Sequence, residues 1–342
     1  MSKRFTVGYG RVWAVVVVAA AIVAVCGRGM AEKCEYRRCE GVVWTTQYHI
    51  TYESDESFND SIQAIYEKVD ASVSKFKEGS LISSINKGEA VMCDDMLVEM
   101  YEEARKVYER SGGAFDPTVS PLMKAWGFAD KGGDLPSDEQ IDSIMAFVGM
   151  NKTRLADRCI EKDDVRIEFD FSAIAKGAAC DEVARMLERN GVKNYLVEIG
   201  GEIALKGVNR QGEPWGVLVD YPAEDLGTGE KGMMVLRMDR GGVATSGNYR
   251  NFKIVDGEKV VHTMNPVTGR PEKTNLLSVT IVAERCMHAD AYATACMVMG
   301  VEKSKAMLEG SDELGALLVY SVGADSLAMW KNDKFAMVIA EE

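Results

Sequence analysis

Residues 165–206 read VRIEFDFSAIAKGAACDEVARMLERNGVKNYLVEIGGEIALK, and this stretch decides the fold. Its opening, 165–171, is dense in β-branched and aromatic residues and predicts a strand. Residues 173–190 have the apolar spacing of an amphipathic helix. Ser172 can cap the start of this helix, and an Asn-Gly pair at its end supplies a stop signal.

Two short strands, 195–199 and 202–206, follow the helix and are joined by a Gly-Gly pair. The chain on either side continues this mixture of elements. Strands are expected at 43–52, 215–220, 235–238, 277–283, 314–320 and 335–340, and helices at 58–76, 96–111, 137–148, 289–299 and 303–308. Because strands and helices are interleaved without regular βαβ units, the predicted fold class is α+β.

The composition is that of a globular protein with a substantial core. The chain has 342 residues, 46% of them hydrophobic and 27% charged, which allows one large domain or two ordinary ones. The formal net charge of −13 argues against binding of nucleic acid, whose backbone is itself negative. The eight cysteines lack the paired spacings of a zinc site, so most are expected to be buried free thiols.

The first 31 residues have the composition of an export signal. They hold four basic and no acidic residues, and 12–25 form an uncharged apolar run. This run is short for a membrane-spanning helix, which needs about 20 residues. Lipidation of Cys26 is one route of processing, although Val25 is not the small residue usual before such a cysteine. Cleavage after Ala31 is a second route, and an uncleaved anchor is a third.

Segment 170–177, Asp-Phe-Ser-Ala-Ile-Ala-Lys-Gly, brings an acid, a hydroxyl and a lysine to the start of a helix. Unpaired N–H groups at such a start favour an anion, and Lys176 adds positive charge. Asp170 could instead accept hydrogen bonds from a sugar or a base. A purely structural role for the segment stays open, because strand–cap–helix patterns are common.

Segment 289–294, Ala-Asp-Ala-Tyr-Ala-Thr, opens another helix. Asp290 and Thr294 are four residues apart and therefore share one face. A carboxylate and a hydroxyl suit Mg²⁺, which keeps its remaining positions for water and phosphate oxygens. The alternative is that Asp290 only stabilises the helix start while Thr294 bonds back to the preceding turn.

Three further segments carry candidate groups. His262, one of three histidines, opens 262–269 beside an Asn-Pro turn signal and could deprotonate a hydroxyl, although a lone histidine is more often structural. Segment 241–249 is small and hydroxylated, which suits a backbone close to a ligand. An Asp-Pro turn lies in 113–119 and is followed by an aromatic segment, 126–128.

Taken together and in this order, these segments resemble the ApbE family, the FAD:protein FMN transferases. The resemblance covers essentially the whole chain from Gly41 onward, as one domain at 41–342. It rests on segments 113–118, 126–128, 170–177, 197–202, 244–249, 262–269 and 289–294. The resemblance implies an ApbE-like, T-fold-related α+β fold with mixed sheets, packed helices and a flavin site between lobes.

The resemblance also implies a reaction. Family members cleave FAD at its pyrophosphate, release AMP and attach FMN to a Ser or Thr hydroxyl of an acceptor protein. They require Mg²⁺, and some mainly hydrolyse FAD to FMN and AMP. A helix start, a lysine and a divalent cation suit this chemistry, because they neutralise charge as the P–O bond breaks.

The resemblance assigns the site by position. Asp290, Thr294 and the backbone carbonyl of Ala173 match metal ligands. Contacts to FAD are implied for Trp44, Phe76, Ala114, Phe115, Asp116, Asp170, Lys176 and Met264. His262 matches the histidine that deprotonates the acceptor hydroxyl.

Four departures from the family pattern occur. Asn265 stands where Asp is usual in a His-x-x-Asp-Pro motif, and Ala293 stands where some members carry a further metal-binding Asp. Segment 44–46, Trp-Thr-Thr, replaces the commoner Met-Gly-Thr, and Lys176 is acidic in some relatives. The proposed histidine and the Asp290–Thr294 pair are retained.

The chain has no acceptor-like Ser/Thr-Gly-Ala-Thr segment, so the acceptor is expected to be another protein, such as a flavinylated subunit of a membrane redox pump or an exported redox protein. The leader then places the catalytic domain on the periplasmic side of a bacterial inner membrane, anchored or as a lipoprotein. Two alternatives remain: an FAD pyrophosphatase, and a non-catalytic FAD-binding lipoprotein. Retention of His262 disfavours the second, because a binding protein needs no general base.

Overall fold

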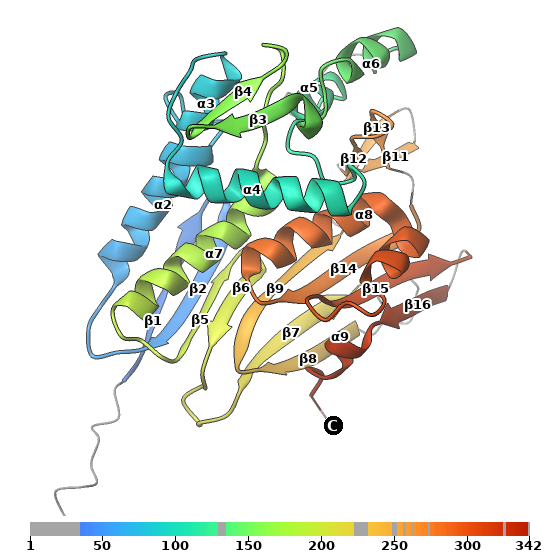
Figure 1. Cartoon of the computed structure of the whole chain (residues 1–342). Helices are drawn as coiled ribbons and strands as arrows, with labels where there is room; N and C mark the ends of the chain where they lie inside the picture. Colours follow the sequence, from blue (N-terminus) through green and yellow to red (C-terminus); the bar gives the residue numbers. More distant parts are fainter. Residues whose placement is uncertain are drawn as a thin grey trace, which may run out of the picture. The chain divides into compact units, whose positions relative to one another are not determined.

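An eight-stranded antiparallel sheet forms the framework, with strand order β1-β2-β5-β6-β9-β14-β15-β16 (Figure 1). Its strands are β1 (Tyr36–Val43), β2 (Thr46–Glu53), β5 (Tyr195–Ile199), β6 (Glu202–Lys206), β9 (Arg240–Gly247), β14 (Leu276–Ala283), β15 (Gly315–Val322) and β16 (Ser326–Lys331). Sheet neighbours such as β2 and β5 are distant in sequence, so helices and loops between them converge on the same sheet.

The computed structural model describes residues 35–128, 135–221, 232–247, 252–255, 258–261, 263–272, 274–323 and 326–340. The chain from Tyr36 to Glu342 is one compact unit, and the fold is that of this unit. The export signal at 1–31 lies outside the described residues. Within them, no helix combines the length and apolar character that crossing a bilayer requires.

Both faces of the sheet are covered, because alternate residues of the central strands enter two different cores. Ala204, Ala244 and Ile281 belong to the core under the helices. Their strand neighbours Leu205 and Val243 belong to a second core, on the opposite face. The hairpin β7 (Trp215–Tyr221) and β8 (Gly232–Met238) and the short helix α9 (Asp333–Ala336) close this second core.

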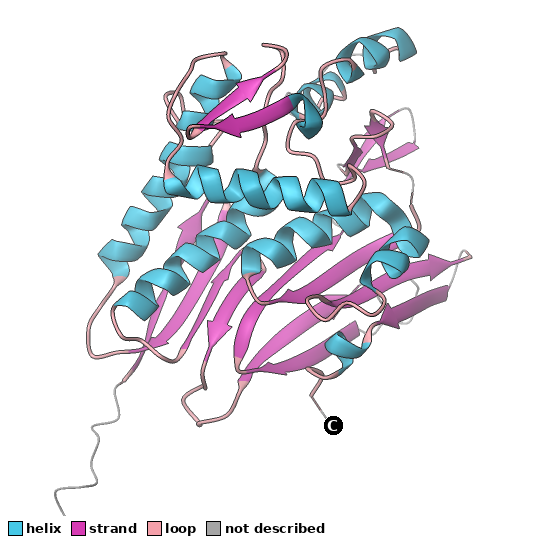
Figure 2. Cartoon of the chain, viewed as in Figure 1, coloured by secondary structure: helices cyan, strands magenta, loops and turns pink. Residues whose placement is uncertain are grey.

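The helices lie across the other face of the sheet (Figure 2). The largest are α2 (Asn59–Val73), α4 (Asp95–Arg110), α7 (Ser172–Arg189) and α8 (Cys286–Leu308). Shorter elements are α3 (Leu81–Asn86), α5 (Ser120–Ala125), α6 (Asp138–Met145) and η1 (Met150–Lys152), with the strand pairs β3–β4 (Thr153–Ala156, Cys159–Lys162), β10–β11 (Phe252–Val255, Glu258–Val261) and β12–β13 (Met264–Asn265, Arg270–Pro271).

Helices α7 and α8 pack closely because two glycines leave room for the start of α8. A Cβ on Gly177 would lie 2.6 Å from the carbonyl oxygen of Cys286, and one on Gly242 would lie 2.2 Å from its nitrogen. Asp181 of α7 then caps α8, since its carboxylate accepts hydrogen bonds from the N–H groups of Cys286 and Met287 at 2.9 and 3.0 Å. The two helices are therefore locked together at one end.

The α+β class and most elements agree with the sequence prediction, but two predicted strands are wrong. Residues 165–171 form no strand. Glu168 makes only an isolated parallel bridge with Val119, and at the next residue the amide of Asn86 bonds both the N–H and the carbonyl of Phe169. Residues 335–340 begin inside α9, where Asn332 caps the helix by accepting from the N–H of Phe335. The two helices predicted at 289–299 and 303–308 are one element interrupted at Gly300, whose φ is 74°.

Candidate active site

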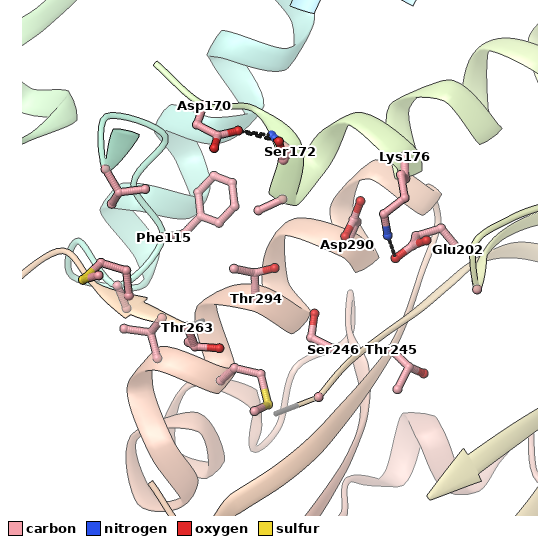
Figure 3. Close-up of a pocket in the computed structure, with 18 of the residues that line it drawn as sticks. Phe115, Asp170, Ser172, Lys176, Glu202, Thr245, Ser246, Thr263, Asp290 and Thr294 are labelled. Carbon is pink, nitrogen blue, oxygen red and sulfur yellow. Dashed lines mark hydrogen bonds and ion pairs between the residues drawn. The ribbon is translucent and has the colours of Figure 1, made fainter. Parts of the chain in front are cut away.

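A cavity of about 610 Å³ opens beside the first turns of α7 and the N-terminal half of α8. Strands β6, β7 and β9 and the loops around 114–119 and 263–266 complete its wall (Figure 3). Nine residues assigned to the site from the sequence line it: Ala114, Phe115, Asp116, Asp170, Ala173, Lys176, Met264, Asp290 and Thr294. Segments separated by more than 170 residues thus meet at one place.

Asp170 lies at the start of α7 and is held there by three donors. The ammonium of Lys75 lies 2.5 Å from its Oδ2. Ser172 donates to Oδ1 from its N–H at 2.9 Å and its hydroxyl at 2.5 Å (Figure 3). Burial alone would raise the pKa of Asp170, but Lys75 and Ser172 together lower it below its ordinary value. The predicted cap by Ser172 is therefore wrong: Ser172 is the first helical residue and Asp170 accepts its N–H.

Asp290 and Thr294 face the cavity from successive turns of α8 (Figure 3). Asp290 is 3% exposed, and its Oδ2 accepts the N–H of Gly177 from α7 at 3.0 Å. No cluster of three His, Cys, Asp or Glu side chains able to cage a metal occurs among the described residues. A cation held by this carboxylate and hydroxyl would need further oxygens from backbone, water or substrate, which is the usual arrangement for Mg²⁺.

Lys176 forms an ion pair with Glu202 at the wall of the cavity (Figure 3). Burial, followed by repulsion from Asp290, raises the pKa of Glu202 even though Lys176 lowers it. Burial also raises the pKa of Asp290. Burial lowers the pKa of Lys176, but the charges of Asp290 and Glu202 together raise it above its ordinary value. Two buried carboxylates thus share one cation, which leaves this part of the cavity short of positive charge.

Asp116 is satisfied by the protein itself. Its Oδ1 accepts the N–H and hydroxyl of Thr118 at 2.8 and 2.7 Å, and its Oδ2 accepts the N–H of Met150 at 3.1 Å. Asp116 therefore shapes the wall around its neighbours Ala114 and Phe115. Asn265 has a similar role, since its Oδ1 accepts the N–H groups of Val267 and Thr268 and so fixes the turn after Met264.

The structure does not bring Trp44 and Phe76 into this cavity. The indole N–H of Trp44 donates to Asp70 at 2.8 Å, and its ring packs edge-on against Tyr66. Phe76 is 83% exposed and lies under the ammonium of Lys75. His262, the predicted base, lies outside the described residues, while Thr263 and Met264, which follow it in the chain, line the cavity.

The sequence analysis did not assign Glu202 and Asp220, which line the cavity, or Lys75, which pairs with Asp170. Glu202 follows Gly200 and Gly201, whose φ angles of 65° and 103° build a two-residue hairpin between β5 and β6. The position of Glu202, an acidic residue directly after a Gly-Gly pair and at the start of a buried strand, could have identified it as a candidate site residue from the sequence. No sequence pattern identifies Lys75 as a site residue, because only the folded chain brings it next to Asp170.

Comparisons with known proteins agree on one family. The model of the ApbE family matches residues 44–318. The chain is 32% identical over 312 residues to the FAD:protein FMN transferase of Vibrio cholerae serotype O1, covering 88% of this chain and 91% of that protein. It is 30% identical over 292 residues to the FAD:protein FMN transferase of Escherichia coli strain K12, covering 83% and 82%.

Solved structures show the same similarity. The flavin transferase ApbE from Vibrio cholerae superposes with a TM-score of 0.81 at 31% identity, covering 89% of this chain and 99% of that one. The apo form of the flavinyl transferase ApbE from Pseudomonas stutzeri gives a TM-score of 0.81 at 28% identity, covering 92% and 100%.

Proposed function

The chain belongs to the ApbE family and is an FAD:protein FMN transferase, and we propose that it uses Mg²⁺ to cleave FAD, releases AMP and attaches FMN to a Ser or Thr hydroxyl of an acceptor protein. The observation that carries the proposal is the shared cavity, where a lysine, a buried carboxylate and a hydroxyl converge from α7 and α8. These are the groups that a pyrophosphate and its cation require.

The donor set fits Mg²⁺. Asp290 and Thr294 would hold the cation, with the backbone of Ala173 on α7 as a further oxygen source at the same cavity. When bound, the cation neutralises charge on the pyrophosphate as the P–O bond breaks. Lys176 contributes a second positive charge, and it is already held near the cavity by Glu202.

His262 is assigned the removal of the proton from the acceptor hydroxyl. A Ser or Thr hydroxyl is a weak nucleophile until a base takes its proton. The position of His262 directly before the cavity residues Thr263 and Met264 supports this role.

We also place the reaction outside the cytoplasm, on the strength of the leader at 1–31. The acceptor is then an exported protein or the exposed subunit of a membrane redox complex. The apolar run at 12–25 followed by Cys26 supports this location.

The purified protein, FAD, Mg²⁺ and a candidate acceptor test the proposal. We expect the acceptor band to become fluorescent in a denaturing gel with an equal amount of AMP released, and both signals to disappear with a chelator. AMP release without labelling would identify a pyrophosphatase, and FAD binding without AMP release would identify a non-catalytic flavin-binding protein. Transfer that persists in the chelator would refute the role of the cation.

A further inference from the structure

Glu202 holds one carboxylate oxygen ready for a ligand. The residue is 4% exposed, and its Oε1 is paired with Lys176. The residue lines the cavity, and its Oε2 is buried and has no hydrogen-bond partner in the described part of the chain. A buried polar atom without a partner is costly, so a group that binds in the cavity has a reason to contact this oxygen.

The chemistry of Oε2 narrows the choice of that group. A phosphate oxygen is an acceptor and is repelled by a carboxylate, whereas the neighbouring ammonium of Lys176 suits it. A hydroxyl satisfies Oε2 in either protonation state of Glu202, because a hydroxyl can donate to a carboxylate or accept from a carboxylic acid. The Lys176–Glu202 pair is therefore suited to a ligand in which a hydroxyl lies next to a phosphate, with the phosphate at Lys176 and the hydroxyl at Glu202.

The two halves of FAD differ in the group carried by the carbon next to the phosphate-bearing carbon. On the FMN side, the ribityl carbon next to the phosphate-bearing carbon carries a free 4′-hydroxyl. On the AMP side, the same position is the ring oxygen of ribose, which has no proton to donate. We propose that Glu202 binds the 4′-hydroxyl of the ribityl chain while Lys176 binds the adjacent phosphate, so that the pair recognises the FMN half of the substrate. The inference rests on the FAD site proposed above.

Calorimetric titration of the whole protein in Mg²⁺ tests this with three probes: FMN, 4′-deoxy-FMN and AMP. We expect the unmodified protein to bind FMN about 10- to 100-fold more tightly than 4′-deoxy-FMN, the range for a hydrogen bond to a charged group. Glu202→Met should bind FMN and 4′-deoxy-FMN equally, at the weaker level. Its affinity for AMP should stay within about twofold of the unmodified protein.

Matched variants separate binding from structural effects. Glu188 is also paired with a lysine, Lys206 at 2.7 Å, but outside the cavity, so Glu188→Met should leave all three affinities unchanged. Glu202→Gln keeps the shape of the side chain and should show the same selective loss, smaller in size, if the methionine variant is unstable. The melting temperature of each variant is measured alongside.

Three results would overturn the inference. One is an unmodified protein that does not distinguish FMN from 4′-deoxy-FMN. Another is an equal loss of FMN and AMP affinity in Glu202→Met, which would mean that Glu202 acts only by placing Lys176. The third is an unmodified protein that binds none of the three probes, which would refute the proposed FAD site itself and the inference with it.

Discussion

Three carboxylates of the cavity, Asp170, Asp290 and Glu202, are each held by a group from another element. Lys75, just after α2, holds Asp170; the backbone of Gly177 in α7 holds Asp290; and Lys176 holds Glu202 in β6. Removing one partner of such a pair leaves the other charge uncompensated and buried, which costs far more than an exposed pair contributes. Single substitutions here should therefore have large and distinguishable effects.

Lys75→Met should destabilise the protein through Asp170. The side chains of Lys75 and Asp170 are 21% and 11% exposed, so we expect the free energy of unfolding at pH 7 to fall by about 1–3 kcal/mol. Because Lys75 lowers the folded-state pKa of Asp170, its stabilisation is present above the unfolded pKa of about 3.9 and is lost as the pH falls through the folded-state value. Urea unfolding of both proteins from pH 7 to pH 3 should show the difference shrinking, and a constant difference would contradict the assignment.

Asp290→Asn should abolish Mg²⁺-dependent AMP release while the fold is kept. The amide oxygen can still accept the N–H of Gly177, but it is a poorer ligand for a hard cation. Loss of at least about 100-fold in rate is expected for removal of such charge stabilisation. Partial recovery at high Mg²⁺ or Mn²⁺ would support a ligand role, whereas an unchanged rate at ordinary Mg²⁺ would exclude it.

His262→Ala should separate transfer from binding. FAD and cation affinity should persist, since their proposed contacts do not include this imidazole. FMN transfer to the acceptor should fall by about 10²–10⁴-fold, the usual contribution of a general base, while some hydrolysis remains. Flavin affinity, melting temperature and acceptor labelling are measured on one preparation, and a stable variant with normal labelling would place the base elsewhere.

At the level of elements, α7 and α8 each contribute a carboxylate that accepts hydrogen bonds from backbone N–H groups of the other helix. Asp181 of α7 caps the start of α8, and Asp290 of α8 accepts an N–H from α7. Gly177 permits the close approach that both contacts need. The spacing between Lys176 and Asp290 is therefore set by helix packing and not by a flexible loop.

Gly177→Ala tests this packing. Alanine normally stabilises a helix interior by about 1 kcal/mol over glycine, yet here its methyl group would clash with the Cys286 carbonyl. We expect a net loss of about 1–3 kcal/mol in unfolding free energy and weaker Mg²⁺ binding. Gly216→Ala on β7 is the control, since a Cβ there meets no atom closer than 3.8 Å, and equal stability changes in the two variants would contradict the packing argument.

The sequence predicted most of the strands and helices, because their apolar side chains alternate or repeat regularly. Through the family resemblance it also predicted nine of the residues that line the cavity. It misplaced 165–171, because a segment dense in β-branched and aromatic residues looks the same whether its backbone pairs with a strand or with the side chain of Asn86. It could not find the Lys75–Asp170 pair, which joins residues 95 positions apart. The local sequence pattern predicts helices and strands through the periodicity of their apolar residues, whereas such a pair depends on the tertiary fold.

At the scale of the whole molecule, the described unit carries the fold and the proposed site, and the leader carries the proposed export signal. The sheet is covered on both faces, so the unit needs no partner to bury its central strands. The leader at 1–31 has the basic and apolar composition of a targeting segment. Removal of 1–31 should therefore leave stability unchanged.

The mature N-terminus tests the proposed export. We expect the protein isolated from its native cell envelope to begin at a lipidated Cys26 or at Glu32, with Cys26 the less favoured because of Val25. Intact-mass spectrometry distinguishes the two by the added acyl chains. A protein that retains Met1 and fractionates with the cytoplasm would refute export.

The cysteines at the junction of α7 and α8 provide a native probe of local opening. The thiols of Cys180 in α7 and Cys286 in α8 are 0% exposed and are not joined by a disulfide. An alkylating reagent reaches them only when the two helices separate, so their labelling rate reports the free energy of that separation. A ligand that binds across both helices slows the labelling by the factor 1 + [L]/Kd, which yields its affinity without any signal from the flavin.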